Sequence, residues 1–164
     1  MHKTNNKTKY QGVGITAYVP DVLHCKYIGC DAYFLGGVLK VLIFHMGLLG
    51  TTQDILKRVF REIKDAYREL DIQGNRLTTL SFSKIQSASA KIACLKCTGA
   101  QARSLLPAVR LVFWKYLTPG DVQHRDILQA LSDSIRFDEI MGRNRDAFRL
   151  PPADAQEFQD CCWS

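Results

Sequence analysis

The chain has 164 residues, which is enough to bury a hydrophobic core and few enough to form one domain. With 46% hydrophobic and 23% charged residues, its composition excludes a disordered or fibrous protein. No apolar run reaches the roughly 20 residues that span a bilayer, and the polar N-terminus lacks the apolar stretch of a secretory signal. We therefore expect an intracellular protein with reduced cysteines and no membrane role.

The net charge of +6 is unevenly distributed. Residues 72–120 contain seven Lys and Arg but no Asp or Glu, whereas residues 121–164 contain nine acids and five bases. A basic segment of this length suits a polyanionic partner such as DNA. Alternatively, it docks on an acidic surface, which the chain's own C-terminal third could provide.

The first expected element is a strand over residues 10–20, where β-branched and aromatic residues alternate with small ones until Pro20. An apolar helix is expected over residues 32–46, in which Gly36 and Gly37 permit close packing.

The clearest element is an amphipathic helix over residues 52–70. Thr51 and Asp54 resemble an N-terminal capping pair, and Gly74 marks the stop. Apolar residues recur at spacings of four and three, which predicts one buried face: Ile55, Val59, Ile63, Tyr67 and Leu70.

The second half is also expected to be helical, except for residues 76–85, which suggest a strand or an extended connector. Pro107 predicts a kink or a helix start near Leu106. Asp121 is expected to cap the next helix, and a short helix is expected over residues 153–162. One helical face before Asp121 is apolar: Leu105, Leu106, Val109, Val112, Phe113, Tyr116 and Leu117.

The predicted fold is therefore mainly α, with one N-terminal strand, or two if residues 77–82 supply a second, followed by a helical array. We expect a flexible basic N-terminus over residues 1–11, a single mostly helical domain over 12–150, and a short C-terminal helix or tail over 151–164. A lone strand needs a partner. Either residues 77–82 supply it or, as we favour, the chain lacks the sheet to which the strand belongs.

Asp21 directly follows the predicted strand, and His24 and Gly29 stand three and eight residues further on. This Asp-x-x-His-x-x-x-x-Gly pattern resembles the second acidic position of CACTA-like eukaryotic transposases. Residues 90–117 look like the helical region that follows in such proteins. The resemblance implies a truncated RNase H-like α/β domain in a nuclear protein, in which Asp21 binds Mg²⁺ and His24 orients that carboxylate or contacts a phosphate.

The chain departs from that pattern in its carboxylates. Two-metal DNA chemistry needs several acids, yet no acid precedes Asp21, and Gln101 stands where a Glu would be sought. We therefore expect a fragment or domesticated relic that does not cut or join DNA by itself. Asp21 as a turn or capping residue, with His24 half-buried, is an equally simple interpretation.

The predicted nucleic-acid surface centres on Lys96, Arg103 and Arg110, whose spacing of seven places them on one face of a helix. Lys84, Lys91 and Lys115 are expected to extend it along a phosphate backbone. A solvated helix face has the same composition. The alternative function is a protein–protein interaction module that docks through helix 52–70, and a third option is a genomic relic without function.

Cys94 and Cys97 form a single CxxC pair. A structural zinc site needs four ligands, and a second pair would have to come from His24, Cys25, Cys30, Cys161 or Cys162. Two small buried residues on one helical face is the simpler interpretation.

Overall fold

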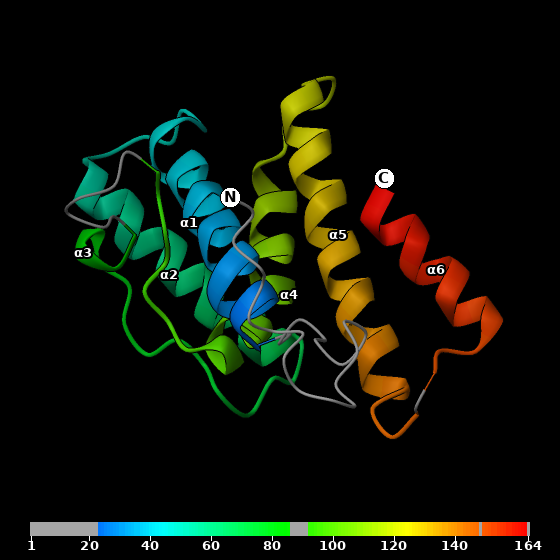
Figure 1. The fold of residues 1–164 in the computed structure, drawn as a ribbon. Coiled ribbons are helices and arrows are strands. Elements are labelled where there is room, and N and C mark those ends of the chain that lie inside the picture. The colour runs from blue at the N-terminus through cyan, green and yellow to red at the C-terminus, as the bar shows by residue number, and fades with distance from the viewer. Residues whose placement is uncertain (1–22, 86–91, 148, 164) are drawn as a thin grey trace, which may run out of the picture.

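The computed structural model describes residues 23–85, 92–147 and 149–163, and within them the chain is a bundle of helices without a strand (Figure 1). The predicted mainly α fold is confirmed. The predicted N-terminal strand and Asp21 lie outside the described residues. The helices are η3 (Leu23–Cys30, a π-helix), α1 (Asp31–Phe44), α2 (Thr52–Glu69), α3 (Phe82–Ile85), α4 (Gly99–Tyr116), α5 (Val122–Arg143) and α6 (Pro152–Trp163).

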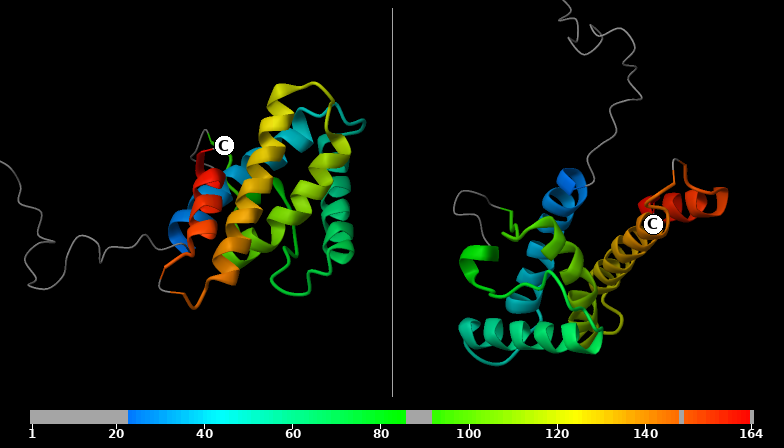
Figure 2. Two further views of the ribbon diagram at one scale, coloured as in Figure 1. Left: turned by 90° about the vertical axis from the view of Figure 1, so that its right-hand side faces the viewer. Right: turned by 90° about the horizontal axis from the view of Figure 1, so that it is seen from below.

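Helix α4 is the centre of the bundle. It packs against α1 and α2 on one side, against α5 on the other, and against η3 (Figures 1 and 2). The apolar face predicted for it is fully buried at five positions: Leu105, Leu106, Val109, Val112 and Phe113. α6 is attached to the outer side of α5, at the far end of the row of helices.

Helix α2 matches its prediction closely. The Thr51 hydroxyl accepts a hydrogen bond from the Asp54 N–H, which satisfies a donor that the first turn leaves free. Ile55, Val59, Ile63 and Tyr67 are buried against the bundle, whereas Leu70 ends the helix and is 41% exposed. The period of the apolar residues therefore fixed both the helix and its inner face.

In two predictions in the middle of the chain, one of the two alternatives is wrong: the helix start near Leu106 and the strand over residues 76–85. α4 begins at Gly99 and runs through Pro107, because Thr98 and Gln101 form a reciprocal capping box that starts the helix well before the proline. Residues 76–81 form the connector that was the alternative to a strand; the Leu77 N–H donates to the Tyr67 hydroxyl at 3.2 Å instead of to a neighbouring strand. The predicted cap at Asp121 is confirmed.

A non-helical segment, residues 92–98, crosses α1 at Gly36. The Leu95 N–H donates to the Ala32 carbonyl at 2.8 Å, and a Cβ on Gly36 would lie 2.9 Å from the Cys94 backbone. Gly36 thus permits the close packing that was expected, while a Cβ on Gly37 would meet nothing within 4 Å. Cys94 and Cys97 lie in this segment and not on a helix.

The apolar helix expected over residues 32–46 ends at Phe44 and continues backwards into η3. The stretch His24–Phe44 is long and apolar enough to cross a membrane by length and composition alone, which the search for uninterrupted apolar runs missed. In this fold 44% of its apolar window is buried in the bundle, and a single helix of this kind among the described residues is weak evidence for a membrane span.

Candidate functional site

The predicted catalytic and metal position was Asp21 together with His24. Asp21 lies outside the described residues, so its predicted role as a Mg²⁺ ligand stays a prediction. His24 is exposed in the first turn of η3, and Gly29 belongs to the same π-helix. In the described part of the chain, no group of three or more His, Cys, Asp or Glu side chains is arranged to hold a metal ion.

The predicted basic surface does not form as one face. Lys96 is exposed but precedes α4, so it does not continue the helical row of Arg103 and Arg110. Lys84 is half-buried, and its ammonium donates to the Thr79 carbonyl at 3.2 Å. Lys91 lies outside the described residues. The assumption that the helix already included Lys96 was the error.

Arg103 and Arg110 lie instead along the border between α4 and α5. The Arg110 Nε donates to the Ser132 hydroxyl at 2.8 Å. Arg103 lines a hollow together with Glu139 and Arg143. Lys115 is exposed near the end of α4, five residues beyond Arg110 and therefore on a different side of the helix.

Sequence reasoning missed a more regular basic row on α2, formed by Lys57, Arg61, Lys64 and Arg68. All four side chains are exposed. Their spacings of four, three and four keep them within about 60° of arc on the helix, opposite its buried face. We call these four residues the α2 basic row. It was hidden because residues 21–71 are neutral as a whole, with seven acids and seven bases.

The acids of α2 stand beside the basic row, not within it. The Glu62 carboxylate accepts a hydrogen bond from the Tyr116 hydroxyl at the contact with α4. Burial, followed by this carboxylate, raises the pKa of Tyr116 to about 12. Asp65 pairs with Arg68 at the edge of the row. A single helix thus presents a predominantly basic outer edge although its total charge is small.

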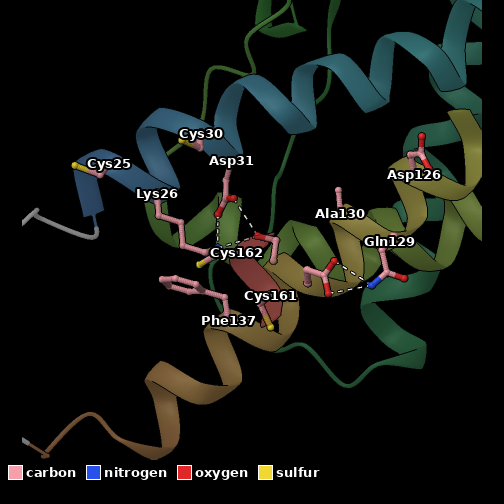
Figure 3. Close-up of a pocket in the computed structure, with 12 residues that line it drawn as sticks. Cys25, Lys26, Cys30, Asp31, Asp126, Gln129, Ala130, Phe137, Cys161 and Cys162 are labelled. Carbon is pink, nitrogen blue, oxygen red and sulfur yellow. Dashed lines mark hydrogen bonds and ion pairs between the residues drawn. The ribbon is translucent and has the colours of Figure 1, made fainter. Parts of the chain in front are cut away.

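A partly buried polar cluster joins η3 to α5, and Figure 3 shows its Lys26 and Asp31 side chains. The Lys26 ammonium donates to Asp31 Oδ2 at 2.6 Å and to Ser134 Oγ at 2.9 Å, and it lies 3.2 Å from Asp138 Oδ1. The Tyr27 hydroxyl donates to Asp138 at 2.7 Å. Burial raises the pKa of Asp31 despite the opposing effect of Lys26. This cluster satisfies its buried charges internally.

The cavity beside the cluster has a volume of about 560 Å³ and lies between η3, α5 and α6. Phe137 and four thiols line it: Cys25, Cys30, Cys161 and Cys162. A Ser hydroxyl beside a Lys amine is used by some hydrolases. Here the Ser134 hydroxyl donates a hydrogen bond to Asp31 Oδ1 at 3.0 Å, and the Lys26 ammonium donates one to the Ser134 hydroxyl. Lys26 is therefore not placed as a base for Ser134, and the pair is arranged for structure and not for nucleophilic attack.

Helix α6 is held on α5 by ion pairs. Arg136 Nε lies 2.8 Å from Glu157 Oε1, Arg143 Nη2 lies 2.6 Å from Asp154 Oδ1, and Arg143 also pairs with Glu157. These arginines lower the pKa of both carboxyls. The Phe137 and Phe158 rings, 4.7 Å apart, add one apolar contact. From residue 152 to 162, α6 has no buried side chain.

Compared with known proteins, the chain matches no family model, no curated protein and no solved structure.

Proposed function

We propose that this chain binds nucleic acid without sequence preference, through the α2 basic row. The observation that carries the proposal is the row itself: four exposed Lys and Arg side chains on one edge of a helix, over about 16 Å of its length. Cations in such a row can each neutralise a phosphate and release a counterion, which is the main source of non-specific affinity.

The rest of the helix favours this surface over the protein-docking alternative. The apolar face of α2, which a protein partner was expected to contact, is buried in the chain's own core at Val59, Ile63 and Tyr67. The outer edge that remains is basic and rigidly presented, because the inner face is packed against α4 and α1. A polyanion fits that edge better than an apolar partner does.

Descent from a transposase is a separate proposal and rests on Asp21, His24 and Gly29 alone. With it belong a nuclear location and an RNase H-like sheet to which residues 10–20 would add. It predicts binding without DNA cleavage or strand transfer, because the acids needed for a two-metal site are missing from the matching positions.

The test compares two variants of equal net charge. The first replaces the α2 basic row by Lys57→Gln, Arg61→Gln, Lys64→Gln and Arg68→Gln. The control neutralises four exposed cations elsewhere: Lys96, Lys115, Arg125 and Arg145. Affinity for a fluorescent DNA duplex is measured by anisotropy between about 50 and 200 mM salt, where phosphate contacts have their largest effect.

We expect the wild-type log–log salt slope to be about −3.6 for four contacts and to approach zero in the row variant, with at least about tenfold weaker binding at low salt. The control should retain most of the slope. If the control variant lost the salt dependence and the row variant kept it, the DNA interface would instead lie around Lys96 and Lys115. A folded wild-type chain that fails to bind at low salt would show that the proposed function is wrong.

A further inference from the structure

The outer face of α5, beneath α6, is a second basic surface. Arg136 and Arg143 point from this face towards α6, with side chains 52% and 43% exposed even with the helix in place. On its other side, the same surface borders α4. One hollow is lined by both Arg103 and Arg143, and a neighbouring one by both Arg110 and Arg136. Four arginines from two helices therefore meet along one border.

Helix α6 supplies the anions that these arginines contact. It carries Asp154, Glu157 and Asp160 and no Lys or Arg. Both Nε and Nη2 of Arg143 donate to one oxygen of Asp154, at 3.1 and 2.6 Å. Guanidinium groups bind carboxylates and phosphates through the same donors. The carboxylates of α6 thus occupy the places in which phosphate oxygens would be bound.

The attachment of α6 is of a kind that competition can reverse. Its ion pairs are partly exposed, and exposed pairs contribute little to stability. The ring contact between Phe137 and Phe158 adds an apolar contact between α5 and α6. A polyanion that offers several phosphates at once can replace two carboxylates, and α6 itself contributes no buried side chain between residues 152 and 162.

We propose that the α5 face bearing Arg136 and Arg143 is a second phosphate-contacting surface and that α6 covers it through Asp154 and Glu157. The proposal rests on the proposed nucleic-acid function and adds a regulatory contact to it. With α6 bound, DNA contacts the α2 basic row alone. With α6 released, Arg136 and Arg143 become two further phosphate contacts, on the same border as Arg103 and Arg110. Asp138 and Glu139 then remain there as neighbouring acids.

The principal variant is Asp154→Asn with Glu157→Gln, which keeps the shape of α6 and removes the two carboxylates. Its control, Asp126→Asn with Asp146→Asn, makes the same charge change at exposed carboxylates that form no ion pair with Arg136 or Arg143. Phe158→Ala is a charge-neutral second route to release. Adding Arg136→Gln and Arg143→Gln to the principal variant tests whether these arginines account for the gain. Folding of each full-length variant is checked by circular dichroism.

Two additional phosphate contacts should steepen the log–log salt slope for duplex DNA by about 1.8 and raise the affinity at low salt by about tenfold. We expect this gain in the principal variant, a smaller gain in Phe158→Ala, and none in the control or after the arginines are neutralised. Equal gains in the principal variant and the control would reduce the effect to net charge and overturn the proposal, as would the absence of any gain.

The two proposals fail separately. If the wild type binds through the α2 basic row and the α6 variants add nothing, the covered surface is refuted and the proposed function stands. If the wild type does not bind but the principal variant does, the α2 proposal fails and the covered surface is retained. If neither chain binds DNA, both proposals are wrong.

Discussion

Helices α2 and α6 both lie at the edge of the bundle, but different forces attach them to it. α2 buries an apolar stripe that includes Val59 and Ile63, both inaccessible to solvent. α6 buries no side chain between residues 152 and 162 and relies on the ion pairs of Arg136 and Arg143. Apolar burial is not screened by salt and is strong for each residue, whereas exposed ion pairs are weak and screened. The chain therefore has a fixed edge and a detachable one.

The largest effect should come from a cavity under α2. Ile63→Ala removes a fully buried side chain between α2 and α4 and should lower the free energy of unfolding by about 3 kcal/mol. Phe158→Ala, the corresponding truncation in α6, should change it by less than about 1 kcal/mol. Urea denaturation followed by circular dichroism measures both. Similar losses of stability in the two variants would mean that α6 is part of the cooperative core, and that α2 and α6 are not attached by different forces.

A smaller effect is expected where the core depends on backbone contact and not on side chains. Gly36→Ala places a Cβ 2.9 Å from the Cys94 backbone, so it should destabilise the fold by about 1–3 kcal/mol. Gly37→Ala, one residue on, meets nothing within 4 Å and should be neutral or stabilise the helix by up to about 1 kcal/mol. Thermal melts should show a lower melting temperature for Gly36→Ala and an unchanged or higher one for Gly37→Ala. Equal shifts would show that residues 92–98 adjust freely over α1.

The smallest effect on the stability of the whole fold should come from lowering the pH, and this effect should be confined to α6. Arg143 and Asn144 lower the pKa of Asp154, and Arg136 and Arg143 lower that of Glu157. The folded state therefore favours the ionised carboxylates. Their stabilisation of α6 is complete above the ordinary carboxyl pKa of about 4 and is lost as the pH falls through the lowered values.

Hydrogen exchange can locate this loss. Protection factors for residues 152–163 should fall on acidification from pH 7 to about 3, before those of α2 change. Asp154→Asn with Glu157→Gln should already have low protection at pH 7 and show little further change. Simultaneous loss of protection in α2 and α6 would contradict separate attachment.

The elements that the sequence predicts well are those governed by local rules. The caps at Thr51 and Asp121, the stripe of α2 and the buried face of α4 depend on residues within one or two turns, and each was correctly predicted. The helix start expected near Pro107 is wrong because the proline rule is also local. The start of α4 is decided by a capping box whose Thr98 lies nine residues before Pro107, and by packing against α1, α2, α5 and η3.

The candidate site was harder to predict because charge acts by position in space. Counting charges by segment indicated residues 72–120 as the basic surface. In the structure, however, Lys96 precedes α4, and Arg110 contacts Ser132. The α2 basic row was recoverable from its spacing, since the same 3.6-residue period that aligns apolar residues also aligns cations. The pairing of Arg143 with Asp154 follows from how α6 turns back on α5, which no periodicity encodes.

The cluster around Lys26 also bears on the order in which the protein assembles during synthesis. Lys26 and Asp31 can pair as soon as they leave the ribosome, but Ser134 and Asp138, which complete their hydrogen bonds, are made more than 100 residues later. Until then, burying η3 would leave the Tyr27 hydroxyl and part of the Lys26 ammonium without partners, at a cost. The first helix of the described chain should thus be among the last to dock, waiting for α5 to emerge.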